Sequence, residues 1–305
     1  MHNTLIQMAL LMLCGACWGI FSPNKLSSLQ TRLVLTTTVY YFFLPAMVLD
    51  VLWQADIGWQ SLQYTAMGFS SMLLAVLISW LTARLFRFSR ARTGAVILSA
   101  SFANVTYLGL PVLEQTYGSF ARSVVIQIDL FATTPLVFTL AIMLARHYGE
   151  ADPTEKPQSF LAFFNAPPFW AAMLAVVLNL YHVPSPLWLS GFLHTCSSAV
   201  PPLMIFSLGL ALSWRALHIR NMPFVAPVVL IKLLLSPGIA LALSPYLTLA
   251  AQYKTVAIMD LAMPSMTLGI VLCDRYKLDS SLYATAVTMT TVLSLLSLPF
   301  WYGLV

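Results

Sequence analysis

The sequence predicts an all-α polytopic membrane protein with ten transmembrane helices, arranged as a 5+5 inverted repeat. Hydrophobic residues make up 59% of the 305 positions and charged residues only 8%, whereas a soluble domain carries about 25% charged residues. With a mean hydropathy of +0.83, the chain has too few polar groups to cover a water-facing surface. The lipid bilayer is therefore the solvent that suits it.

Ten segments are apolar over the roughly 20 residues that a transmembrane helix needs. They are residues 4–22, 33–53, 62–86, 94–112, 121–146, 167–183, 187–213, 222–246, 254–273 and 281–304. The longest polar stretch, 147–160, holds two prolines and four charges. It predicts a cytoplasmic linker between a five-helix repeat at 1–146 and a second at 161–305. Because each half has an odd number of spans, the second half enters the membrane inverted.

The basic residues divide unevenly between the two sides of the predicted membrane. Two of the fifteen, Arg122 and Lys254, fall in even-numbered connections, and Lys232 lies inside span eight. The other twelve fall in odd-numbered connections: Lys25, Arg32, Arg84, Arg87, Arg90, Arg92, Arg146, Lys156, Arg215, Arg220, Arg275 and Lys277. Cytoplasmic loops carry excess Lys and Arg, so this pattern predicts both termini outside, on the periplasmic side of a bacterial inner membrane.

Several other functions lack the residues they need. The basic residues form no stripe interleaved with aromatics, which disfavours nucleic-acid binding despite the net charge of +5. Cys14 and Cys17 have redox-motif spacing, but they lie in an apolar helix beside Gly15 and Gly19, whose small-xxx-small spacing indicates helix packing. Walker A, H-E-x-x-H, G-x-S-x-G and clustered Cys/His motifs are missing. The sequence therefore predicts neither an enzyme nor a bound cofactor.

Short internal similarities support the inverted repeat. The run Asn104-Val-Thr-Tyr-Leu-Gly109-Leu in span four aligns with Pro264-Ser-Met-Thr-Leu-Gly269-Ile in span nine. In spans two and seven, Leu44-Pro-Ala-Met47 similarly matches Pro201-Pro-Leu-Met204. Two matches in the same order indicate that spans four and nine occupy equivalent places in the two halves.

The first of these segments also carries a family resemblance. Asn104, Gly109 and Pro111 resemble the N-x-x-x-x-G-x-P signature of the auxin efflux carrier family, as do Ala262-Met-Pro264 and Asp274-Arg-Tyr276 near the C-terminus. The resemblance implies a ten-span fold shared with bile acid:sodium symporters, in which spans four and nine unwind and cross at mid-membrane. Spans one, two, six and seven would form a scaffold bundle against the other six. Bacterial members are similar to permeases for small carboxylates such as malonate or malate.

A broken crossing of this kind would suit an anionic solute. Pro264 sits in mid-span and removes a helix hydrogen bond, and non-helical backbone at that depth is tolerated only inside protein or along a wet cavity. Exposed half-helix N-termini favour carboxylates. We therefore expect substrate binding at Asn104, Thr106, Tyr107, Pro264 and Ser265. The alternative is that Pro264 only kinks span nine and Asn104 only joins helices.

Asp260 is the candidate for coupling. A carboxylate at the bilayer midplane costs about 2.5–3.5 kcal/mol on insertion scales, so it indicates a functional site. The resemblance implies that an acidic residue at this offset binds a coupling cation, with Asn104, Ser123 and Gln127 near the sodium ligands of relatives. Those relatives carry glutamine where this chain has Pro264, which argues against a second sodium. Burial disfavours the charged carboxylate, so a proton is the alternative to Na+.

Lys232 and Asp129 also lie deep in predicted spans. Lys232 would either attract an anionic substrate or pair with an aspartate, and pairing is the favoured interpretation for both residues. Together these observations predict a secondary active transporter for a small organic anion, with a carboxylate as the expected substrate, working by alternating access. The competing hypothesis is a membrane sensor that binds the same solute without moving it. The sequence leaves a homodimer open.

Overall fold

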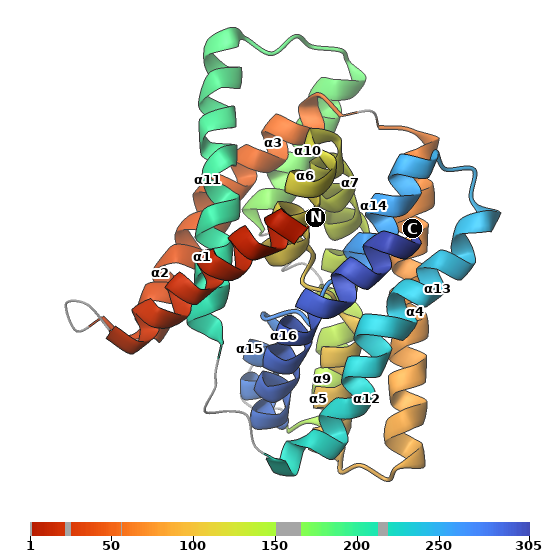
Figure 1. The fold of residues 1–305 in the computed structure, drawn as a ribbon. Coiled ribbons are helices and arrows are strands. Elements are labelled where there is room, and N and C mark those ends of the chain that lie inside the picture. Colours follow the sequence, from red (N-terminus) through yellow and green to blue (C-terminus); the bar gives the residue numbers. More distant parts are fainter. Residues whose placement is uncertain (1, 22–25, 56, 151–165, 213–218) are drawn as a thin grey trace.

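The computed structural model describes residues 2–21, 26–55, 57–150, 166–212 and 219–305. The predicted linker at 147–160 falls mostly outside these residues, as do Lys25, Lys156 and Arg215 of the basic-residue count. The described chain is helical throughout, with one isolated backbone bridge and no strand (Figure 1).

The first half contains α1 (His2–Phe21), α2 (Ser28–Thr38), η2 (Val39–Phe43), α3 (Leu44–Trp53), α4 (Trp59–Leu85), α5 (Arg90–Ser101), η3 (Val105–Gly109), α6 (Leu110–Tyr117), α7 (Ser119–Ile128), η4 (Asp129–Thr133), α8 (Thr134–Leu136), η5 (Val137–Ala141) and α9 (Ile142–Tyr148). The second half contains α10 (Pro167–Leu180), α11 (Leu187–Ala211), η8 (Ile219–Asn221), α12 (Met222–Leu230), η9 (Ile231–Leu235), α13 (Ser236–Leu243), η10 (Ser244–Tyr246), α14 (Ala251–Leu261), α15 (Gly269–Arg275) and α16 (Ser280–Leu304). Segments η2, η3, η4, η5 and η9 are π-helical turns.

Six helical segments of the described chain are long and apolar enough to cross a membrane. They are Ser28–Trp53, Trp59–Leu85, Ser119–Tyr148, Leu187–Ala211, Met222–Tyr246 and Ser280–Leu304. Each matches one predicted span, so the all-helical multi-pass class is confirmed. Two further predicted spans are shorter apolar helices, Thr4–Gly19 and Pro167–Leu180. The remaining two, spans four and nine, are interrupted helices, and the total of ten spans stays a prediction.

Helix contacts divide the described molecule into two groups. In the first, α11 packs against α1, α2 and α3, and α3 also packs against α10. In the second, α4 contacts α5 and α13, while α16 contacts α5, α12 and α15. Figure 1 shows α1, α2 and α11 on the left and α4, α12 and α13 on the right. Helices α6 and α7 touch the first group through α1, α3 and α11, so the interface between the groups runs along them.

Glycines bring α1 and α11 into backbone contact. A Cβ added at Gly15 would lie 2.2 Å from the carbonyl oxygen of Phe206, and one at Gly209 would lie 2.0 Å from that of Met12. Only the hydrogen atom of a glycine side chain fits between these backbones. This agrees with the prediction that Gly15 serves close helix packing. Both Cys14 and Cys17 are free thiols on the exposed side of α1.

This contact makes a stability prediction. Gly209→Ala is expected to lower the apparent melting temperature of the purified protein, because overpacking costs about 1–3 kcal/mol and backbone atoms of α1 cannot rotate aside. Gly191→Ala on the same helix is the control, since its Cβ would meet nothing within 4 Å. That variant should match or exceed the wild type, because alanine is the better helix former. Equal melting temperatures for the two variants would contradict this prediction.

Four of the five described π-helical turns have the same cause. Pro45, Pro111, Pro135 and Pro237 each stand two residues after the last residue of such a turn. Proline lacks an amide hydrogen and its ring collides with the carbonyl four residues earlier, so the preceding turn widens and bonds to the fifth residue instead. Such π-turns occur frequently at functional sites, and three of these four contribute to the cavity described below.

Candidate solute-binding site

Two helix interruptions meet in the interior of the molecule. The helical run stops after α5 at Ser101 and resumes at η3, while the second interruption separates α14 from α15. The Asn104 amide donates to the Pro264 carbonyl at 2.8 Å, and the Met266 amide donates to the Phe102 carbonyl at 3.0 Å. These bonds form an antiparallel bridge between Ala103 and Ser265. Buried backbone groups need partners, and here each interruption supplies those of the other.

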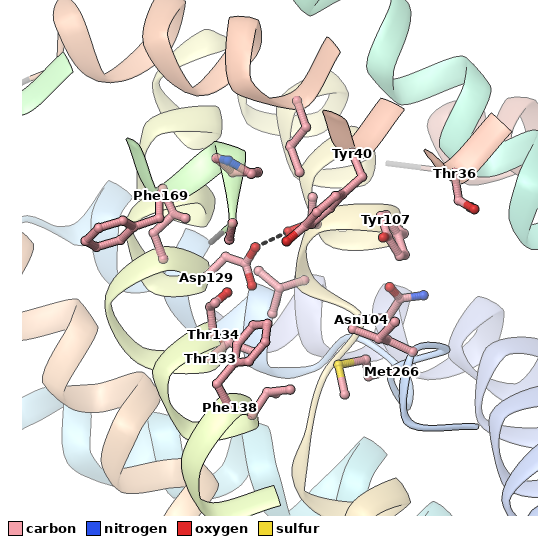
Figure 2. A pocket seen from close by; sticks show the side chains of 18 of the residues that line it. Thr36, Tyr40, Asn104, Tyr107, Asp129, Thr133, Thr134, Phe138, Phe169 and Met266 are labelled. Carbon is pink, nitrogen blue, oxygen red and sulfur yellow. Dashed lines mark hydrogen bonds between the residues drawn. The ribbon is translucent and has the colours of Figure 1, made fainter. Parts of the chain in front are cut away.

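A cavity of about 420 Å³ lies against the first interruption. Figure 2 shows side chains from several separate elements pointing into it. Its wall is mainly apolar and aromatic, and includes Tyr40, Tyr41, Tyr107, Phe138, Phe169 and Met266. Its polar groups come from Thr36, Thr37, Asn104, Thr106, Asp129, Thr133, Thr134 and Arg275. Small-molecule sites typically have this size and this mixture of apolar wall with few polar groups.

Three of the five predicted substrate residues line the cavity. They are Asn104, Thr106 and Tyr107. Pro264 and Ser265 are absent from its wall, because their backbone is bonded to the first interruption and Ser265 is fully buried. Met266 takes their place on the wall. At Pro264 and Ser265, the second interruption therefore stabilises the first through backbone hydrogen bonds and does not line the cavity.

The cavity side of the first interruption is rich in hydrogen-bond donors. Segment η3 continues directly into α6, so one helix begins at Val105 and its first amides lack helical partners. Just before it, Asn104 is 2% exposed, and its Nδ2 has no hydrogen-bond partner among the described residues. A buried amide donor beside a helix N-terminus is an arrangement that suits an anion.

Asp260 lies at the last turn of α14, behind the cavity. It is fully buried, and neither carboxylate oxygen has a hydrogen-bond partner within the described chain. A Cβ added at Gly109 would lie 2.5 Å from Asp260 Oδ1 and 3.6 Å from the Asn104 carbonyl oxygen. The Asp260 carboxylate and the Asn104 carbonyl oxygen therefore both lie near Gly109. Because glycine has no side chain, there is room for the carboxylate.

The two remaining predicted coupling residues pair with each other. Gln127 Nε2 donates to Ser123 Oγ at 2.9 Å on α7, and Gln127 Oε1 is buried without a partner among the described residues. Helix α7 contacts both η3 and α14. This places the pair on a helix that packs against the elements carrying Asn104 and Asp260.

Lys232 and Asp129 lie in different surroundings. Fully buried Lys232 donates from Nζ to the Leu261 carbonyl at 3.4 Å and to Ser236 Oγ at 3.5 Å. Within the part of the chain that the structure describes, it forms no ion pair with either aspartate. Asp129 instead lines the cavity, where the Thr106 hydroxyl donates to its Oδ2 (Figure 2).

A second polar cluster joins the two helix groups away from the cavity. Arg122 on α7 forms an ion pair with Glu114 of α6 and donates to Ser197 Oγ of α11 at 2.6 Å. Asp50 Oδ2 of α3 lies 3.9 Å from Arg122 Nη1 and 3.8 Å from His194 Nδ1. Arg122 is 7% exposed, so it is a nearly buried cation bridging three helices beside its own.

Sequence reasoning missed much of the cavity wall. Tyr40, Thr133, Phe138 and Phe169 received no role, and Asp129 was expected to pair with a charge. For Tyr40 the sequence held a signal, because this residue stands five positions before Pro45 and so falls in a widened turn. Phe138 and Phe169 have no such mark, since apolar residues of a span look alike whether they face lipid or a cavity.

The interrupted, mutually bonded helices and the solute-sized cavity are typical of a multi-pass membrane transport protein. A family model described as membrane transport protein matches residues 2–302, and the chain belongs to this family, the auxin efflux carriers that its motifs resemble. It is a transport protein and not an enzyme.

Two curated relatives come from archaea. An uncharacterized transporter of Methanothermobacter thermautotrophicus is 28% identical over 313 residues, covering 98% of this chain and 96% of the relative. An uncharacterized transporter of Methanocaldococcus jannaschii is 28% identical over 238 residues, covering 75% of this chain and 74% of the relative. Both are similar to this chain along most of their length.

Proposed function

We propose that this protein is a secondary active transporter for a small organic carboxylate, which binds where the two interruptions meet. The observation that carries the proposal is the buried Nδ2 of Asn104, which has no partner in the described part of the chain and belongs to a residue on the wall of a solute-sized cavity, beside the helix N-terminus at Val105. The amide and the free backbone N–H groups would hold the solute carboxylate, with the helix dipole adding attraction. Ten spans in two inverted halves would frame the site.

Asp260 would bind the coupling ion, Na+ or H+. An ionised carboxylate buried without a hydrogen bond is strongly disfavoured, so Asp260 needs either a proton or a cation on its two orphaned oxygens. The Asn104 carbonyl oxygen, which also lies near Gly109, would be a neighbouring oxygen ligand for a hard cation. Ion binding at Asp260 and solute binding at Asn104 would then be linked through Asn104 itself.

Alternating access would proceed by movement of one helix group against the other. The cavity extends to Ile142 and Arg275, near the connections that the basic-residue pattern places in the cytoplasm of an inner-membrane protein. The Arg122 cluster ties the groups together near the predicted outer connection at Gly118. This combination is the one expected of an inward-facing state, with the cavity open inside and the Arg122 cluster closed outside.

Counterflow in proteoliposomes tests the proposal. Vesicles loaded with unlabelled mono- or dicarboxylate should take up the labelled compound saturably, because a transporter exchanges bound solute across the membrane. Asn104→Ala should abolish this exchange, since it removes the amide donor at the site. Thr195→Ala is the control for reconstitution, because Thr195 is exposed on α11 and bonds only its own helix at Gly191.

The same experiment separates a transporter from a sensor. A sensor would bind carboxylates, detected as a rise in melting temperature, without exchanging them. Binding without counterflow by the wild type would overturn the transport proposal, and normal counterflow by Asn104→Ala would overturn the site.

A further inference from the structure

The solute cavity contains a carboxylate that pairs with no cation among the described residues. Asp129 belongs to η4 and lines the same cavity as Asn104 (Figure 2). Within the described residues it makes no ion pair, and its Oδ2 accepts a hydrogen bond from the Thr106 hydroxyl. A solute whose only charges are carboxylates would be repelled by an ionised Asp129. A solute that also carries an ammonium group would be attracted by it.

The donor groups and Asp129 are close neighbours. Thr106 belongs to the first turn of the helix whose N-terminus faces the cavity, and its own hydroxyl is bonded to Asp129. Asn104 stands two residues before it, and its buried Nδ2 has no partner within the residues that the structure describes. The Thr106 contact therefore places Asp129 beside the first turn of this helix, so one α-amino acid can present its carboxylate to that turn and its ammonium group to Asp129.

The rest of the wall matches an apolar side chain. Tyr40, Tyr107, Phe138, Phe169 and Met266 surround the polar groups, and Figure 2 shows the labelled aromatic rings on more than one side of Asp129. The one cationic side chain among the described lining residues is Arg275, which belongs to the last turn of α15, away from the helix N-terminus. A second carboxylate on the solute would therefore have no matching cation beside Asp129.

We infer that the cavity selects a zwitterionic solute, an α-amino acid with an apolar side chain, with its ammonium group on Asp129 and its carboxylate at Asn104 and the Val105 helix N-terminus. This inference rests on the proposed function and narrows its substrate class from carboxylates in general to amino acids. Asp129 is the residue that sets this preference.

The test compares amino acids with matched acids that lack the amine. Leucine, methionine and phenylalanine are paired with 4-methylpentanoate, 4-(methylthio)butanoate and 3-phenylpropanoate, and malonate and malate serve as dicarboxylates. Binding to the purified full chain is measured by thermal shift and calorimetry at neutral pH. At least one amino acid should bind roughly tenfold or more tightly than its amine-free partner, as expected for a charge-assisted hydrogen bond.

Two variants test which residues set the preference for amino acids. Asp129→Asn keeps the shape of the side chain and an acceptor for Thr106, so it should fold, yet it should weaken amino-acid binding roughly tenfold or more while leaving the amine-free acid as tight or tighter. Asn104→Ala should weaken both members of each pair. The ratio between the pair members is the readout, because a purely structural defect would reduce both together.

The failures of the two proposals are distinguishable. One possible result is that malonate, malate or an amine-free acid binds as tightly as every amino acid, and that this binding depends on Asn104. This result would overturn the amino-acid preference and leave the carboxylate transporter standing. Unchanged amino-acid binding by Asp129→Asn would also overturn it. Absence of binding by all three amino acids would overturn it as well, whatever the counterflow experiment gives.

Discussion

Asp260→Asn is expected to abolish gradient-driven solute uptake, with expression and membrane topology unchanged. The substitution is isosteric, so the space above Gly109 stays filled, but the side chain can no longer hold a proton or balance a cation. Uptake into proteoliposomes is measured under an imposed Na+ gradient and, separately, under an imposed pH gradient. The gradient that drives the wild type identifies the coupling ion, and Asp260→Asn should respond to neither.

Asp274→Asn is the matched control for this experiment. It makes the same chemical change on α15, one residue past the end of the same predicted span, where the side chain is exposed. Its uptake should equal that of the wild type. If Asp260→Asn transported as well as Asp274→Asn, Asp260 would have no part in coupling, and its two orphaned oxygens would need another explanation.

Arg122→Ala is expected to open the outer side of the protein. Removing the guanidinium leaves the partly buried carboxylates of Asp50 and Glu114, which are 11% and 21% exposed, without their shared cation. Breaking a buried ion pair by removing one partner costs about 3–5 kcal/mol. Because the cost is paid only while the cluster is closed, the equilibrium shifts toward the outward-open state. A change of that size alters a two-state ratio by roughly a hundredfold or more.

Cys196 offers a native reporter of this opening. It is buried on α11 beside Ser197, which accepts a hydrogen bond from Arg122. In a protein whose other three cysteines are replaced by alanine, a membrane-impermeant maleimide added outside should label Cys196 of Arg122→Ala roughly tenfold faster or more than in the unaltered Arg122 background.

Arg92→Ala controls for the loss of an arginine. Arg92 pairs with Asp279 at 3.4 Å, but its side chain is 43% exposed, and such surface pairs contribute about 0–1 kcal/mol. Its labelling rate should stay at the parent value. Equal labelling rates for Arg122→Ala and Arg92→Ala would show that the Arg122 cluster does not hold the outer side closed.

The sequence was sufficient to predict the class of protein and the two helix interruptions beside which the candidate cavity lies. Low charge and long apolar runs predicted a helical membrane protein, and Pro264 and Asn104 marked the two interruptions that the structure joins. The direction in which each side chain points could not be predicted from the sequence. Pro264 and Ser265 were expected to contact solute, yet their backbone is used to complete the hydrogen bonds of Phe102 and Asn104.

The sequence also could not predict which charged residues pair with each other. Lys232, Asp129 and Asp260 all looked like candidates for mutual pairing, because each is an isolated charge in an apolar span. Which charges meet depends on the rotation of each helix, and a π-turn upstream of Pro135 or Pro237 changes that rotation within a few residues. Asp129 consequently faces the cavity, and Lys232 bonds to the backbone at the end of α14. The periodicity of apolar residues along a helix does not predict such local changes in its rotation.

The bridge between Ala103 and Ser265 has a consequence for biogenesis. When the ribosome has finished the first half, the backbone groups of Phe102 and Asn104 have no partners, because those partners are encoded more than 150 residues later. The glycine surface of α1 is likewise vacant until α11 is inserted. Unbonded peptide groups in lipid cost several kcal/mol each. The nascent first half must therefore remain incompletely packed until the second arrives, and separately expressed halves should be stable only when produced together.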